Sequence, residues 1–139
     1  MSRVEFREIV NDFEFLEDWE DRYRYIIDLG KNLDPLDETL KNERTIVNGC
    51  ASQVWLAYEI KGEADSKTIL FKGESDALIV KGLIAIILTL FNEEKIHEAI
   101  NIDALAELEK LGLNEHLSSQ RSNGLRAMIN KIQFIITNL

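Results

Sequence analysis

Apolar residues at helical spacing open the chain. Between residues 6 and 13 they recur at i, i+3, i+4 and i+7, which predicts a helix that buries one stripe. Ser2 followed by Glu5 has the spacing of a capping box, so we expect this helix to start near residue 3. A second apolar stripe predicts a helix from Asp18 to Gly30, where the glycine would serve as a left-handed cap.

The periodicity changes in the middle of the chain. It lapses over residues 31–44 around Pro35, the only proline, which predicts a loop. Three runs rich in β-branched and aromatic residues follow at residues 45–47, 53–60 and 67–73. Short connections between these runs predict an antiparallel meander of three strands.

The second half of the chain is helical in pattern. Ser75 and Asp76 are candidate N-caps for a helix over residues 77–91, which is apolar almost all round and is expected to be central. Strands in one block between helical ends indicate an α+β fold, with the sheet packed against helices. Further helices are expected over residues 93–100, from Asp103 to Gly112, and after Ser118 or Ser119 with the stripe Leu125, Met128, Ile129, Ile132, Ile136 and Leu139.

Composition narrows the class of protein. With 139 residues, 45% of them hydrophobic and 29% charged, the sequence predicts a single domain spanning residues 1–139. A formal net charge of -9 repels phosphate backbones and anionic membranes, so we expect no nucleic-acid or membrane partner. Residues 1–10 lack a secretory signal, and the longest apolar run, residues 82–91, is about half of a membrane span. We therefore expect a cytoplasmic protein.

Common catalytic and ligand motifs are missing. The sequence has no glycine-rich phosphate loop, no G-x-S-x-G and no paired-histidine metal signature, and His97 and His116 are expected at the surface or at helix ends. The single cysteine, Cys50, excludes an intrachain disulfide, a multi-cysteine zinc site and a cluster held by one chain. No metal and no cofactor are expected.

Cys50 has an unusual setting for a lone cysteine, which is often a small buried hydrophobe. Its neighbours from Asn48 to Ser52 are small and turn-prone, so it lies on a loop that can bring sulfur close to another molecule. No Lys, Arg or His lies within five residues of it, Arg44 being the nearest cation. The thiol is not activated by its own segment, and an ordinary thiol has a pKa of about 8.5.

Three motifs follow one another along the chain: VNGCASQVW at residues 47–55, SDALIVKGL at residues 75–83 and RSNGL at residues 121–125. In this order and spacing they resemble the motifs of the SufE family of sulfur-acceptor proteins. The resemblance implies a SufE/NifU-like fold in which a three-stranded antiparallel sheet packs against helices. It also implies that Cys50 is the sulfur acceptor, carried on a loop tip that rests against apolar groups and swings out on docking.

The family's function follows from the same resemblance. A SufE-like protein takes persulfide sulfur from a pyridoxal-phosphate (PLP) dependent cysteine desulfurase (SufS-like), stimulates that enzyme, and passes the sulfur to an iron–sulfur scaffold (SufBCD-like). It is a carrier and an activator rather than an enzyme, and the PLP belongs to the partner. Arg121 matches a family arginine that could stabilise the thiolate or the loop, or serve only the start of its helix. Gly49, Ser52 and Asp76 match candidate partner contacts, with Asp76 also a candidate cap.

Several alternatives remain open at this point. The same relay could feed tRNA or cofactor sulfuration instead of a scaffold. A cluster scaffold is disfavoured by the single thiol, and a thiol redox sensor or peroxidase would need a low thiol pKa. A non-catalytic interaction module with an idle Cys50 is the plainest alternative.

Overall fold

The computed structural model describes residues 5–139, apart from the side chain of Asn114. The expected helix start near residue 3 and its Ser2 cap lie outside the described residues. The helices are α1 (Phe6–Phe15), α2 (Trp19–Lys31), α3 (Leu78–Phe91), α4 (Ile96–Ala99), α5 (Ala104–Glu109), α6 (Leu113–His116) and α7 (Ser119–Thr137). Strands β1 (Val54–Lys61) and β2 (Thr68–Ser75) and the 3-10 turns η1 (Glu38–Leu40) and η2 (Ala64–Ser66) complete the chain.

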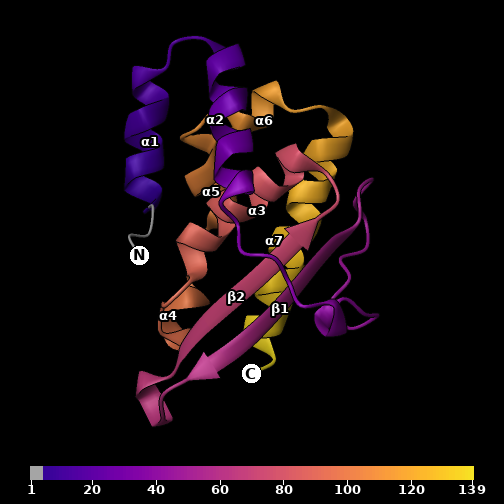
Figure 1. The fold of residues 1–139 in the computed structure, drawn as a ribbon. Helices are drawn as coiled ribbons and strands as arrows, with labels where there is room; N and C mark the ends of the chain where they lie inside the picture. The colour runs from indigo at the N-terminus through magenta and orange to yellow at the C-terminus, as the bar shows by residue number, and fades with distance from the viewer. Residues whose placement is uncertain (1–4) are drawn as a thin grey trace.

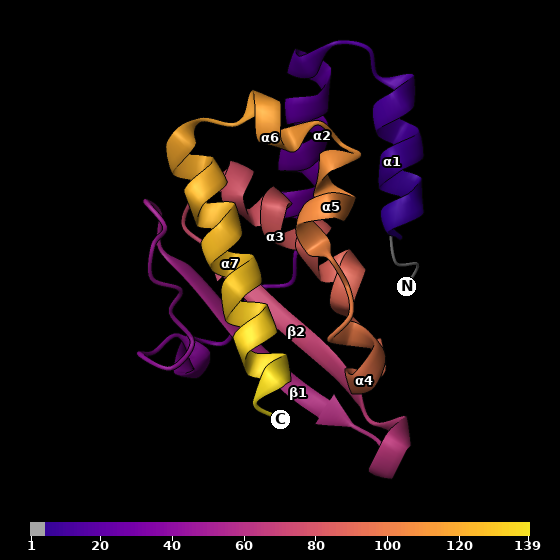
Figure 2. The same cartoon turned by 180° about the vertical axis from the view of Figure 1, so that it is seen from behind.

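An antiparallel hairpin and a layer of helices build the molecule, which makes the fold α+β as expected. Figure 1 shows the hairpin in front of α3 and α7, and Figure 2 shows α7 in front of the hairpin, so these helices cover one face of the sheet. Val54 and Leu56 of β1 and Ile69 and Phe71 of β2 point to that face and are buried. The core therefore lies between the hairpin and the helices.

The expectation of a third strand was wrong. Residues 45–47 join β1 only through an isolated bridge between Ile46 and Trp55. Two hydrogen bonds flank the bridge: the amide of Val47 donates to Val54 at 2.8 Å, and the amide of Leu56 donates to Thr45 at 2.8 Å. A side-chain turn at Asn42 precedes this segment and the cysteine loop follows it, so the segment is too short to form a strand.

Two glycines let α2 and α3 cross in close contact. A Cβ on Gly30 would lie 2.6 Å from the amide nitrogen of Gly82, and a Cβ on Gly82 would overlap the backbone of Ile26. The predicted role of Gly30 as a left-handed cap was therefore wrong, because α2 continues to Lys31 and Gly30 is buried inside it. Glycine serves here to bring two backbones together.

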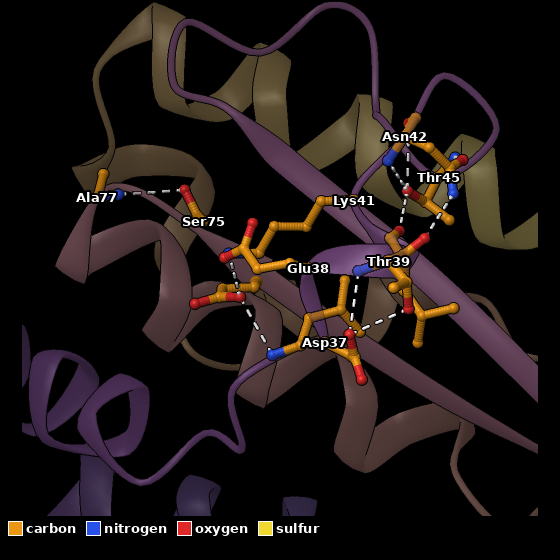
Figure 3. A network of polar contacts seen from close by, with 11 residues as sticks. Asp37, Glu38, Thr39, Lys41, Asn42, Thr45, Ser75 and Ala77 are labelled. Carbon is orange, nitrogen blue, oxygen red and sulfur yellow. Dashed lines mark hydrogen bonds and ion pairs between the residues drawn. The ribbon is translucent and has the colours of Figure 1, made fainter.

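The expected cap of the central helix was also wrong. Ala77 occupies the N-cap position of α3, and no side chain caps this helix. Ser75 is buried at the end of β2, and its hydroxyl accepts a hydrogen bond from the amide of Ala77 at 3.2 Å (Figure 3). Asp76 bonds elsewhere, to the cysteine loop.

The remaining helices follow the sequence pattern closely. The expected helix starts at Asp18 and Asp103 and the expected cap at Ser118 are confirmed, since each of these residues is the N-cap and its side chain accepts a hydrogen bond from a first-turn amide. The stripe on α7 is buried except for Leu139, which is 47% exposed beyond the end of the helix. The short helix α6 was not expected.

Candidate functional site

The cysteine loop spans residues 48–53 between two hydrogen-bonded ends. At one end Val47 and Val54 pair through the backbone. Gly49 has φ +96°, a conformation that side chains rarely adopt, and a Cβ there would lie 3.3 Å from the Cβ of Ala127 in α7. The local sequence thus turns the chain sharply against α7 and places Cys50 beside that helix.

Cys50 is half-buried, and its thiol rests on one turn of α7. The Sγ atom lies 3.6 Å from the carbonyl oxygen of Gly124, a distance suited to a weak hydrogen bond donated by the thiol. A Cβ on Gly124 would stand 3.5 Å from Sγ, an ordinary van der Waals contact, so the thiol packs directly over the glycine of the RSNGL motif. Among the hydrogen bonds of residues 5–139, this is the one that reaches the tip of the loop, which is otherwise held by van der Waals packing.

A pocket of about 370 Å³ opens beside the thiol, between the cysteine loop and the N-terminal parts of α3 and α7. Its wall is shared about equally between an apolar part and a polar part, the latter from the cysteine loop and the start of α7. The apolar wall comes from Ala77, Ile79, Val80 and Leu83 with Leu125 and Met128, and the polar part from Ser52, Ser118, Gln120 and Arg121. The thiol therefore borders a pocket with one apolar side and one polar side.

Asp76 fixes the second end of the loop. Its Oδ1 accepts a hydrogen bond from the amide of Gln53 at 3.1 Å, and its own amide donates to the carbonyl of Gln53 at 3.4 Å. Residues 48–52 are thus suspended between the Val47–Val54 pair and the Gln53–Asp76 pair. This geometry leaves the tip as the part of the segment with the fewest attachments.

Arg121 and Ser52 line the same pocket as Cys50, whereas Gly49 does not. The backbone amide of Arg121 donates to the hydroxyl of Ser118 at 3.3 Å, inside the cap of α7. Among the hydrogen bonds and ion pairs of residues 5–139, none joins the Arg121 side chain to Cys50 or to an acidic residue. In this structure the guanidinium is exposed at the mouth of the pocket.

Burial raises the pKa of the Cys50 thiol above its ordinary value. The group is therefore a neutral thiol at neutral pH, which agrees with the hydrogen bond that it donates to Gly124. The reactivity of the sulfur depends on leaving this environment, since the thiolate is the nucleophile.

A second polar cluster supports the segment that leads into the cysteine loop (Figure 3). Glu74 of β2 accepts hydrogen bonds from Lys41 at 3.0 Å and from the amide of Leu36 at 3.1 Å. Lys41 also pairs with Glu38 at 2.9 Å and stands 5.2 Å from the ring centroid of Trp55. The nearby ammonium lowers the pKa of Glu74. Trp55 therefore faces this outer layer of the sheet rather than the thiol pocket.

Sequence reasoning found the thiol but missed most of its surroundings. The apolar residues of α3 and α7 were expected only as core positions, and Gly124 was named only within the RSNGL motif, with no role beside the thiol. Among residues 5–139, no cluster of three or more His, Cys, Asp or Glu side chains could hold a metal ion. Within the same residues, no helix has both the length and the apolar character needed to cross a bilayer.

Comparison with known proteins decides the family. The sequence model of the SufE family, described as an Fe-S metabolism associated domain, matches residues 7–136. The chain belongs to the SufE family. It is 52% identical over 126 residues to an uncharacterised SufE-like protein of Rhizobium meliloti strain 1021, covering 91% of this chain and 90% of that protein. An uncharacterised SufE-like protein of Rhizobium etli is 48% identical over 126 residues, covering 91% of this chain and 85% of that protein.

A solved structure has the same fold as this chain. The solution structure of a hypothetical protein from Thermus thermophilus matches with a TM-score of 0.75 and covers 99% of this chain and 97% of its own. The two sequences are 16% identical, so the likeness concerns the arrangement of the elements alone. Membership of the SufE family associates the chain with iron–sulfur metabolism.

Proposed function

We propose that this SufE-family protein is a sulfur carrier that receives sulfane sulfur on Cys50 from a PLP-dependent cysteine desulfurase. It then delivers the sulfur to an iron–sulfur cluster assembly scaffold. The observation that carries the proposal is the position of the only cysteine, half-buried on a suspended loop beside a pocket that is part apolar and part polar. The family's association with Fe-S metabolism supports the same conclusion.

The chemistry is a transfer between two thiols. The Cys50 thiolate attacks the outer sulfur of the donor's persulfide, so a new S–S bond forms on Cys50 while the donor's S–S bond breaks. The donor cysteine leaves as a thiolate, and the Cys50 proton passes to solvent or to a base of the donor. No electrons are gained or lost overall, because the step is the persulfide form of thiol–disulfide exchange. The PLP acts earlier, in the partner.

The resting structure suits a carrier that is inactive alone. A neutral, half-buried thiol is slow to react with oxidants, since oxidation follows thiolate character and exposure. When the tip swings out, Cys50 loses the contact with Gly124 and the burial that raises its pKa. The loop ends at Val47–Val54 and at Gln53–Asp76 remain as anchors in this movement.

The other matched residues have roles within this proposal. Arg121, exposed at the mouth of the pocket, stabilises the negative charge of the thiolate or persulfide when the tip moves. Gly49 permits the turn that the tip requires, Asp76 holds the loop's second end, and Ser52 stands at the rim where a partner arrives. The protein activates the desulfurase by removing its bound product.

Competing uses of the thiol fit the site less well. A peroxidase or redox sensor needs a low-pKa, accessible thiolate, whereas burial here raises the pKa of Cys50. A cluster scaffold needs several ligands, and the described residues bring no acidic or histidine side chain into the pocket beside Cys50.

The turnover of the desulfurase tests the proposal. With cysteine as substrate, the wild-type protein is expected to raise the rate of alanine formation by the desulfurase, because Cys50 removes the persulfide that would otherwise block the next turnover. The Cys50→Ser variant, which keeps the size of the side chain, is expected to lose this increase entirely. An equal increase with Cys50→Ser would show that the effect does not depend on sulfur acceptance and would overturn the proposal.

A further inference from the structure

One edge of the hairpin is covered along only part of its length. The outer edge of β1 bonds to residues 45–47 through the carbonyl of Val54 and the amide of Leu56. Backbone groups that face one edge recur at every second residue, so Tyr58 and Ile60 direct theirs to the same edge. Within the described chain, no backbone or side-chain hydrogen bond from outside the hairpin reaches either residue.

The opposite edge of the hairpin, on β2, is bonded along the stretch from Lys67 to Phe71 that pairs with the exposed half of β1. The amide of Ile69 donates to Glu94, the carbonyl of Ile69 accepts from Glu93, and the amide of Ile96 donates to Lys67. The side chain of Asn92 bonds both the amide of Phe71 at 2.7 Å and its carbonyl at 3.2 Å. Open strand edges are normally protected in this way, so the exposed half of β1 stands out.

Helix α7 forms one wall above the edge of β1. Two successive residues on one side of α7 lie against residues 44–49, which cover the first part of this edge. Ala127 lies next to Gly49, and the Nζ of Lys131 donates to the carbonyl of Arg44 at 3.1 Å. Helical spacing places Phe134 on the same side of α7, one turn further on. Phe134 is 67% exposed because residues 44–49 do not extend this far along α7.

The result is a vacant strand position continuous with residues 44–47. Its floor is the free edge at Tyr58 and Ile60, which are 45% and 39% exposed, and its wall is α7 at Phe134. Figures 1 and 2 both show the C-terminal half of α7 reaching the far end of β1. Ile60 also lines one pocket with Ile136 and Leu139, so the end of α7 lies over this end of the strand.

The width and charge of this position indicate its occupant. The protein's own segment 44–47 shows that one extended chain fits between β1 and α7. A second folded copy would bring its own α7 to the space between β1 and α7. A single extended strand therefore fits this space better than a second copy does. Lys131 stands at the end of this position near residues 44–47. At the other end Lys61 lies 3.9 Å from Glu59, and Asp65 lines the pocket that Ile60 also lines, so the basic end is the one at Lys131.

We propose that the β1 edge from Tyr58 to Lys61 binds an extended segment of a partner protein by strand addition. The segment is apolar at alternate positions, which face Tyr58 and Phe134, and acidic at the end that meets Lys131. Its end lies against Thr45, which bonds β1 just before the cysteine loop. The proposal does not depend on the sulfur chemistry, because neither Cys50 nor its pocket takes part in the binding.

The test uses a synthetic peptide of the stated chemistry, acetyl-Asp-Val-Thr-Val-Thr-Val-Asp-amide, titrated into isotope-labelled full-length protein. NMR is expected to show saturable shifts along residues 57–61 and slower hydrogen exchange at the Tyr58 and Ile60 amides. The same peptide with alternate amides methylated cannot form the ladder and is expected not to bind. Absence of saturable binding up to about 1 mM would overturn the proposal.

Variants distinguish strand addition from nonspecific hydrophobic binding of the peptide. Ile60→Pro removes one outward donor without removing a bond to β2, and it is expected to weaken binding at least tenfold. Phe134→Ser tests the same vacant strand position if the proline variant fails to fold. Phe15→Ser is the control, at an exposed aromatic residue elsewhere. Equal binding by Phe134→Ser and Phe15→Ser, or a wild-type dimer in sedimentation that protects the same amides, would contradict the proposal.

Discussion

Replacing Gly82 with alanine is expected to lower the free energy of unfolding by about 3 kcal/mol or more. A Cβ at this position would overlap the backbone of Ile26, so α2 and α3 would have to separate along their whole contact. The intrinsic gain from placing alanine in a helix, about 1 kcal/mol, does not offset this. Urea unfolding followed by circular dichroism measures the change.

Gly124→Ala is the matched control. Gly124 is also buried within a helix, but its added Cβ would stand 3.5 Å from the nearest atom, an ordinary contact. This variant is expected to be unchanged in stability or more stable by about 0.5 to 1 kcal/mol, the usual gain for a compatible glycine-to-alanine change. Similar losses in both variants would contradict the close crossing of α2 and α3.

The second large effect is expected at the thiol itself. In the wild-type protein, alkylation of Cys50 by iodoacetamide is expected to be slow at pH 7 and to rise only above about pH 8.5, the ordinary thiol pKa, because burial raises the folded value. Gly124→Val places two methyl groups where Sγ now rests and pushes the loop tip outward. For each unit by which the pKa of Cys50 falls back toward its ordinary value, the thiolate fraction at neutral pH rises about tenfold, and the alkylation rate rises with it.

The sign of the pH effect on stability follows from the same shift. A raised thiol pKa means that the native state favours the neutral form of Cys50. The neutral thiol therefore adds fully to the free energy of unfolding below the pKa of the unfolded state, and this stabilisation is lost as the pH rises through the pKa of the folded state.

Gly124→Ala is again the control for the alkylation measurement, and its alkylation rate is expected to be close to that of the wild-type protein. The account of the site is contradicted if wild-type Cys50 reacts at pH 7 as fast as the urea-unfolded protein.

Much of the fold was predictable from local pattern. Apolar stripes located α2 and α7, and the acidic or hydroxyl residues before them located their caps, because both signals depend on the residues of one helix. The third strand was not predictable, since residues 45–47 show strand propensity but are cut short by a turn on each side. Gly30 was misread because its role depends on Gly82, a residue distant in the sequence.

The site was predictable in its chemistry but not in its geometry. Small residues around a lone cysteine indicated an accessible loop, and the SufE motifs indicated its role. The partner of the thiol, the carbonyl of Gly124, lies 74 positions away in the sequence, and only the folded chain brings them together. Asp76 illustrates the same limit, since its place before a helix suggested a cap whereas its contacts hold the cysteine loop.

Direct detection of the transferred sulfur tests the central claim. The protein is mixed with a desulfurase that carries a persulfide, separated from it, and analysed by intact mass spectrometry under non-reducing conditions. Because the chain has one cysteine, the account predicts a mass increase of one sulfur atom, removed by dithiothreitol and absent from Cys50→Ser. If the desulfurase keeps its persulfide while Cys50 stays a free thiol, the protein is not the sulfur acceptor.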